Sequence, residues 1–185
     1  MPELNNQKFN HLKIHTQYSI CEGAIKIDNL KNFCKENKIL CLGLSDTSNL
    51  CGALEFAENI SKVGTQPIIG TQIFFRFEDT TGLLPLIALN EKGYKRIIEL
   101  SSKSYLENDA LSDPHLDIKD LLIDTDGLIL LSGTIQGLFG KLFEKGRLEE
   151  VTKIYKSLSS KFYDRFYLEI QRHGDQNETA FEKFN

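Results

Sequence analysis

The chain has 185 residues, of which 41% are hydrophobic and 26% are charged, and its formal net charge is −4. These values are typical of one globular domain, and the negative charge argues against this segment alone gripping a phosphate backbone. The sequence lacks an apolar run of the roughly 18 residues that a membrane helix needs, residues 1–8 carry no signal region, and four cysteines without Cys-x-x-Cys spacing indicate reduced thiols in a cytoplasmic protein.

Short apolar runs alternate with helical periodicities along the chain. Strands are predicted at 13–19, 39–44, 67–77, 84–89, 127–131 and 166–170. Helices are predicted at 25–37, 52–63, 94–104, 117–123, 136–145 and 148–162, with a polar connection at 105–116. This order predicts an α/β fold with a mainly parallel sheet or barrel. Residues 179–185 read as an amphipathic helix without a terminal cap, so we expect a fragment of a longer protein.

Two polar segments stand out because each follows or ends an apolar run. Residues 11–19 contain a Lys-x-His pair and then Tyr-Ser, and residues 44–53 contain Ser-Asp-Thr-Ser-Asn. Four further short motifs follow in order along the chain, at residues 67–72, 90–94, 127–133 and 166–170. Together these segments resemble the N-terminal PHP (polymerase and histidinol phosphatase) domain of bacterial DNA polymerase III alpha subunits, and the resemblance extends from Phe9 to about Glu178.

The resemblance implies a fold and a domain organisation. The expected architecture is a distorted TIM-like (βα)7 PHP barrel, truncated before its last strand or strands. Residues 1–185 would then form a single PHP domain that is incomplete at the C-terminus.

Metal-binding members of this family are expected to hold a cluster of divalent ions, and the ligand positions can be carried over one at a time. They correspond here to Lys13, His15, Glu22, Thr47, Gln72, Leu83 and Thr134. A cation at the first position and neutral side chains at most of the others cannot assemble such a cluster, which needs converging imidazoles and carboxylates. The resemblance therefore implies a degenerate site with no catalytic residue, no metal and no cofactor in this segment, Mg being confined to the polymerase domain of the parent chain.

The implied function follows from the parent protein. The parent would be a DNA-directed DNA polymerase of bacterial replication, a nucleotidyltransferase that contacts DNA and the other subunits of the polymerase III holoenzyme. The segment itself would stabilise the polymerase and dock the proofreading exonuclease subunit, without contact with a membrane. Two alternatives are an active metal-dependent phosphoesterase, acting as a 3′–5′ exonuclease or a pyrophosphatase, and an independent interaction module.

Two residues near the lost ligands carry specific expectations. Asp46 is expected to shape its loop by accepting hydrogen bonds from backbone N–H groups. Lys13 is expected to replace the missing metal charge, with its amine within about 4 Å of Glu22 or Asp46.

Overall fold

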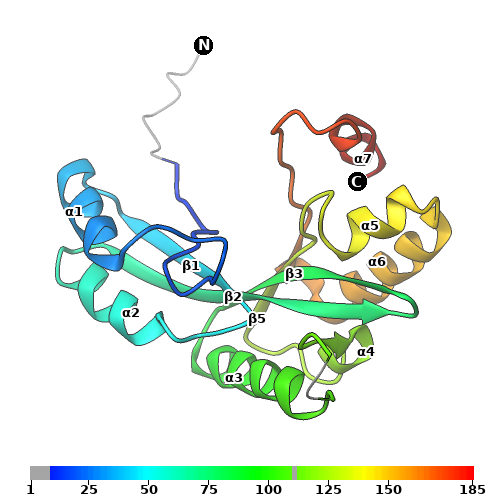
Figure 1. Ribbon diagram of the computed structural model, residues 1–185, viewed down its shortest axis with the longest axis horizontal. Helices are drawn as coiled ribbons and strands as arrows, with labels where there is room; N and C mark the ends of the chain where they lie inside the picture. The colour runs from blue at the N-terminus through cyan, green and yellow to red at the C-terminus, as the bar shows by residue number, and fades with distance from the viewer. Residues whose placement is uncertain (1–8, 110–111) are drawn as a thin grey trace.

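The computed structural model describes residues 9–109 and 112–185 (Figure 1). Residues 1–8, where the sequence contains no signal region, and residues 110–111 of the predicted polar connection lie outside the described residues. The strands are β1 (Cys41–Thr47), β2 (Gln66–Phe77), β3 (Thr80–Ala88), β4 (Leu116–Asp117), β5 (Leu128–Leu131) and β6 (Phe166–Tyr167). The helices are α1 (Ile27–Asn37), α2 (Ala53–Ser61), α3 (Glu91–Leu106), α4 (Ile118–Leu121), α5 (Leu138–Glu144), α6 (Leu148–Phe162), the 3-10 turn η1 (Tyr163–Arg165) and α7 (Glu178–Phe184).

The strands form one mixed sheet in the order β1-β2-β3-β5-β6, with β4 also paired to β2. The pairs β1–β2, β2–β4 and β5–β6 are parallel, whereas β3 is antiparallel to both of its neighbours. The α/β class predicted from the sequence is confirmed. The mainly parallel arrangement holds for the other five strands, and β3 is the exception that the sequence pattern missed.

The reversal at β3 has a local cause. Only Glu78 and Asp79 separate β2 from β3, and a connection of two residues can join antiparallel strands but cannot cross over to a parallel one. Glu78 has a φ of 52°, as turns of this kind require, and Asp79 accepts a hydrogen bond from Arg147 at 2.6 Å. Residues 78–82, expected to close one strand, therefore form the turn and the beginning of the next.

Three smaller differences concern strands at the margins of the sheet. The strand expected at 13–19 is reduced to isolated bridges, from Ile14 to Leu44 and from Thr16 to Ile25. The last strand is shorter than the predicted 166–170, and the unpredicted β4 joins the last residue of the predicted polar connection to the first residue of the helix predicted at 117–123. Each of these segments makes few backbone pairs, so its hydrophobic pattern predicts the bounds of a strand poorly.

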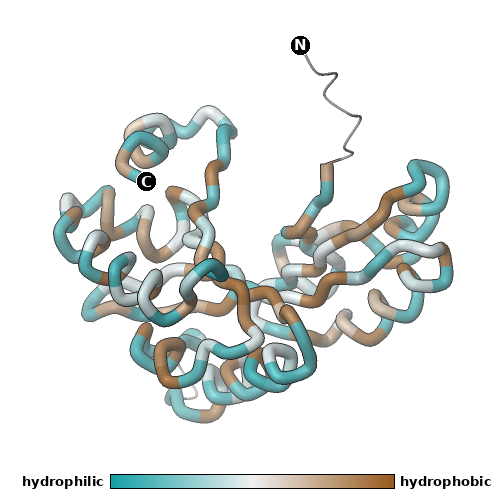
Figure 2. Tube along the Cα trace, turned by 180° about the vertical axis from the view of Figure 1, so that it is seen from behind, coloured by the Kyte–Doolittle hydropathy of each residue, from teal (hydrophilic) through white to brown (hydrophobic). Residues whose placement is uncertain are grey.

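Helices cover one face of the sheet. Leu42 and Leu44 pack against α1 and α2, and a larger cluster joins β2, β3 and β5 to helices α3 to α6. In Figure 1, α1 and α2 flank one end of the sheet, α3 and α4 lie below it, and α5 and α6 lie at the other end. Figure 2 shows the apolar residues concentrated along the strands, with hydrophilic residues on the outer turns of the helices.

The start of α3 shows how tightly the covered face is packed. The Asn90 side chain caps the helix by accepting a hydrogen bond from the Gly93 N–H at 3.1 Å. A Cβ atom at Gly93 would lie 1.7 Å from the carbonyl oxygen of Gly127. The Asn-x-x-Gly motif at residues 90–93 is thus a cap followed by a close backbone contact.

The opposite face of the sheet carries the candidate site. Thr47, Gln72 and Pro85 are paired across β1, β2 and β3, and paired residues of neighbouring strands share a face. The carboxyl ends of β1, β5 and β6 meet at one edge because these strands run in the same direction, and such edges commonly carry binding sites in α/β proteins.

Candidate functional site

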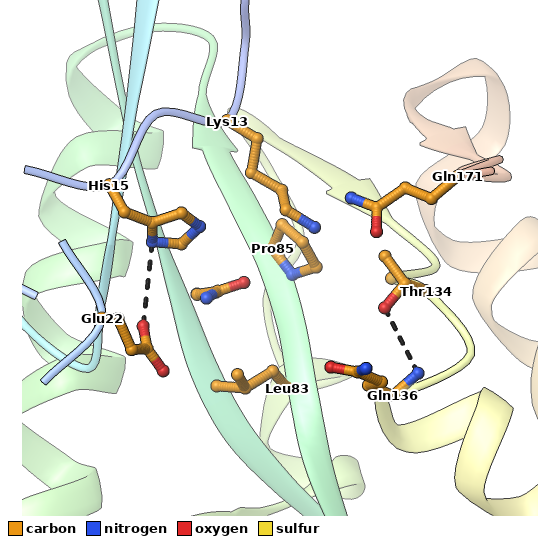
Figure 3. A pocket seen from close by; sticks show the side chains of 11 residues that line it. Lys13, His15, Glu22, Leu83, Pro85, Thr134, Gln136 and Gln171 are labelled. Carbon is orange, nitrogen blue, oxygen red and sulfur yellow. Dashed lines mark hydrogen bonds and ion pairs between the residues drawn. The ribbon is translucent and has the colours of Figure 1, made fainter. Parts of the chain in front are cut away.

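A cavity of about 380 Å³ lies on this open face (Figure 3). One wall comes from the N-terminal segment before α1, and the floor comes from β2 and β3. The opposite wall comes from the loop between β5 and α5 and from the extended segment after β6. The lining residues are Lys13, His15, Glu22, Gln72, Leu83, Pro85, Gly133, Thr134, Gln136, Gly137 and Gln171.

Asp46 organises the N-terminal wall. Its carboxylate is fully buried and accepts hydrogen bonds from the Thr16 backbone N–H at 2.6 Å, from the Thr16 hydroxyl at 2.8 Å and from the Ser19 hydroxyl at 2.7 Å. The Ser19 oxygen in turn accepts the backbone N–H of Thr47 at 3.0 Å. The expected loop-shaping role of Asp46 is confirmed for one backbone N–H group, and its other two donors are hydroxyl groups.

A chain of hydrogen bonds links three of the positions carried over from metal-binding relatives. The Gln72 amide donates to the Thr47 hydroxyl at 2.9 Å, and that hydroxyl donates to Glu22. The other Glu22 neighbour is His15, whose Nδ1 lies 3.9 Å from a Glu22 oxygen. Burial lowers the pKa of His15, opposed by the Glu22 charge and reinforced by that of Lys13, so the neutral imidazole is favoured.

Lys13 crosses the cleft and corrects one expectation. Its amine lies 2.7 Å from a carboxylate oxygen of Glu169, a residue 156 positions away in the chain. Only 20% of the Lys13 side chain and 13% of the Glu169 side chain are exposed, so this is a largely buried ion pair. Lys13 therefore does neutralise a carboxylate in the cleft, but the predicted partners, Glu22 and Asp46, were wrong. Those two carboxylates are instead held by hydroxyl and backbone donors.

The positions derived from the sequence come together in space. Lys13, His15, Glu22, Gln72, Leu83 and Thr134 all line the cavity, and Thr47 is bonded to two of them. Sequence reasoning missed Glu169, Gln136 and Gln171 on the far wall. The available signal was a single carboxylate inside the apolar run of residues 166–170, which needs a partner if the run is buried.

The side chains present do not suit a cluster of divalent ions. Such ions need several acceptor atoms at close range, yet the cleft presents the Lys13 ammonium and the Gln72 and Gln171 amides, of which the last donates to Glu169 at 3.0 Å. Within residues 9–109 and 112–185, three or more His, Cys, Asp or Glu side chains nowhere gather in an arrangement that could hold a metal. The four cysteines are free thiols, with Cys34 buried and Cys21 and Cys51 exposed.

Comparison with known proteins decides the family. The PHP domain family matches residues 11–173, which is most of the chain. The chain belongs to the PHP domain family. The resemblance to this family inferred from the sequence is confirmed.

Relatives of this PHP chain include proteins named DNA polymerase III subunit alpha. The protein from Caulobacter vibrioides is 37% identical over 98% of this chain and 17% of its own length. Those from Borreliella burgdorferi and Vibrio cholerae are 36% and 33% identical over 90% and 98% of this chain, and 15% and 16% of their own lengths. The chain thus spans about one sixth of the curated relatives it matches. A solved amidohydrolase from Chromobacterium violaceum overlaps 51% of this chain and 34% of its own at 14% identity, with a TM-score of 0.40, a likeness too slight to bear on function.

Among the described parts of this PHP chain, helices long and apolar enough to cross a membrane are absent.

Proposed function

We propose that this chain is the PHP domain of a replicative DNA polymerase alpha subunit, and that its cleft serves structure rather than metal-dependent hydrolysis. The observation that carries the proposal is the Lys13–Glu169 ion pair at 2.7 Å within the cleft. A lysine ammonium supplies one positive charge where metal-binding relatives would place divalent ions, and it offsets one carboxylate.

The neighbouring bonds support the same proposal. Thr47 and Gln72 bind each other, and Thr47 also binds Glu22, so these side chains satisfy one another without an ion. A polar network whose members are all paired stiffens its surroundings, whereas a half-satisfied network would destabilise them. The cleft would therefore hold the N-terminal segment against the strands.

The sheet fits the expected barrel as a proposal about the whole domain. We propose that residues 1–185 form a single PHP domain whose sheet is part of a distorted TIM-like (βα)7 barrel. Helices on one face, a polar cleft on the other and five strands with a common direction support this architecture. In barrels of this class the site lies at the carboxyl ends of the strands, as the cleft does here.

The wider role is taken from the named relatives. In the parent protein, the polymerase would act on DNA in the cytoplasm with Mg in its own polymerase domain, together with other holoenzyme subunits. This domain would stabilise that polymerase and dock the proofreading exonuclease subunit.

Metal content and hydrolysis test the proposed loss of chemistry. The purified 185-residue chain, prepared without chelator, should contain less than one Mn, Fe, Zn or Mg ion per chain by elemental analysis. It should hydrolyse single-stranded DNA, pyrophosphate and simple phosphate esters no faster than the His15→Ala variant, with or without added metal. A tightly held ion that is lost in His15→Ala, or a metal-dependent rate that this variant abolishes, would favour the active phosphoesterase instead.

Docking is tested separately, because an inert site does not by itself imply a partner. The chain, immobilised through its N-terminus, should retain the exonuclease subunit of the same organism, while an unrelated domain immobilised in the same way should not. If the exonuclease binds the full-length polymerase subunit but not this chain, the docking role does not reside in residues 1–185.

A further inference from the structure

Glu169 has two carboxylate oxygens in unlike surroundings. Oε1 faces the cleft and accepts hydrogen bonds from Lys13 at 2.7 Å and from Gln171 at 3.0 Å. Oε2 is buried and has no hydrogen-bond partner among the described residues. A buried acceptor without a donor is strongly unfavourable, so Oε2 calls for a donor that the protein chain does not supply.

Asn185 has the complementary group, a buried donor without an acceptor in the part of the chain that the structure describes. Its Oδ1 accepts the Tyr155 hydroxyl at 2.9 Å. Its Nδ2 is then buried and has no acceptor among the described residues. Burial raises the pKa of Tyr155, against a smaller opposing effect of the Ser132 hydroxyl, so the phenol stays protonated and keeps donating to Asn185.

Glu169 and Asn185 both line one small cavity beneath α7. This cavity has a volume of about 10 Å³ and is lined by Glu169 and Asn185 with Thr134, Ile135, Ile170, Gln171, Glu178, Phe181 and Glu182. Glu169 lies between the cleft and this cavity. Its Oε1 accepts hydrogen bonds from the cleft residues Lys13 and Gln171, and its backbone N–H donates to the Ser132 hydroxyl oxygen at 2.9 Å. The volume is close to the minimum that holds one water molecule.

The charges around the cavity favour a neutral ligand. Lys13 already offsets Glu169, three backbone N–H groups of residues 173–175 hold Glu178, and Arg172 holds Glu182. A cation could satisfy Oε2 but would meet the N–H of Asn185, which is a donor. A water molecule can donate to Oε2 and accept from Nδ2 at the same time.

We propose that a single buried water molecule occupies this cavity and bridges Glu169 Oε2 to Asn185 Nδ2. The carboxylate that neutralises Lys13 in the cleft then also anchors α7. The resulting polar chain runs from Lys13 through Glu169 and the water to Asn185 and Tyr155, and joins the N-terminal segment to α6 and α7.

A crystal structure of the 185-residue chain at a resolution that shows ordered water tests the site directly. We expect one water within about 3.2 Å of both Glu169 Oε2 and Asn185 Nδ2. In solution, the side-chain amide protons of Asn185 should show nuclear Overhauser peaks at the water frequency with the sign of a long-lived water. A dry cavity in which Nδ2 bonds directly to Oε2, or a metal ion identified there by anomalous scattering, would overturn the proposal.

A substitution tests the anchoring role. Asn185→Leu removes the donor to the proposed water and also the acceptor of the Tyr155 hydroxyl, so backbone amides of α7 should exchange with solvent about tenfold faster or more. The matched control is Gln176→Leu, which replaces an exposed side-chain amide just before α7. Equal exchange in α7 for both variants would contradict the anchoring role.

Discussion

The two faces of the sheet are built by different means. The helix-covered face is closed by buried apolar side chains from strands β1 to β5, and fully buried residues such as Phe75, Leu86 and Leu130 lie at its centre. The cleft face is held by an ion pair, hydrogen bonds and only a few apolar side chains such as Leu83 and Pro85. The stability of the covered face depends on how well side-chain volumes fill the core. The stability of the cleft face depends on which donor pairs with which acceptor.

The difference matters for how each face tolerates change. A core position loses stability in proportion to the space that is left or overfilled. A polar position loses stability when a substitution leaves its partner buried and unpaired, although the volume is almost unchanged. Substitutions that keep the volume but alter hydrogen bonding should therefore be mild on the covered face and severe at the cleft.

The largest effect is expected from Gly93→Ala at the covered face. The added Cβ would lie 1.7 Å from the Gly127 carbonyl oxygen, and a backbone atom cannot move aside as a side-chain tip can. We expect a loss of about 3 kcal/mol or more in the free energy of unfolding, measured by urea denaturation.

Gly146→Ala is the control for Gly93→Ala. Gly146 has a φ of +74° with open space around its Cβ position, so alanine there meets strain without a clash. Its cost should be only about 1 kcal/mol. Equal losses for the two variants would show that the contact between α3 and Gly127 is looser than described.

Asp46→Asn tests the polar wall of the cleft with almost no change of volume. The carboxylate accepts three hydrogen bonds through its two oxygens, and an asparagine keeps only one of these oxygens and places an N–H₂ group at the other. We expect a loss of about 2–3 kcal/mol in urea denaturation. Asp126→Asn, on an exposed loop, should stay within about 0.5 kcal/mol of the parent, and a comparable loss there would contradict the special role of Asp46.

The elements of the covered face could be predicted because burial leaves a periodic record in the sequence. Helix α6 begins and ends at the predicted residues 148 and 162, and α1 and α2 lie within a few residues of their predicted bounds. Each buries one stripe of apolar side chains, and that spacing alone identifies a helix. The β2–β3 hairpin was missed because its orientation depends on the length of a turn rather than on hydrophobic spacing.

The cleft was predictable only in part. The residues that line it could be located from short motifs, since those motifs lie at the ends of strands that meet at one edge of the sheet. The partner of Lys13 could not, because Glu169 lies 156 positions away in the chain and only the completed fold brings it to the amine. A sequence pattern shows which residues are polar. It does not show which of the carboxylates of Glu22, Asp46 and Glu169 forms the ion pair with the Lys13 ammonium.

Lys13→Met distinguishes the observed ion pair from the two carboxylates first expected. The methionine leaves Glu169 buried without its cation, so we expect a loss of about 1–3 kcal/mol in urea denaturation. Combining Lys13→Met with Glu169→Gln should recover part of that loss because the amide carries no charge. Adding Glu22→Gln to Lys13→Met should recover nothing, and recovery there instead would place the amine beside Glu22.

The smallest expected effect is a pH dependence carried by His15. Burial lowers the pKa of this imidazole in the folded chain, so the folded state binds a proton more weakly than the unfolded chain does. The resulting stability is present above the unfolded pKa of about 6.5 and is lost as the pH falls through the folded value. Unfolding free energies measured by urea between pH 5 and 8 should therefore decline toward acid, and His15→Gln should flatten that decline in the range below about pH 6.5.

His11→Gln, at an exposed position outside the cavity lining, is the matched control and should keep the slope of the parent chain. If His15→Gln keeps the same slope as well, the imidazole is not shielded by the cleft, and this wall of the site is more open to water than the other contacts of the polar face imply.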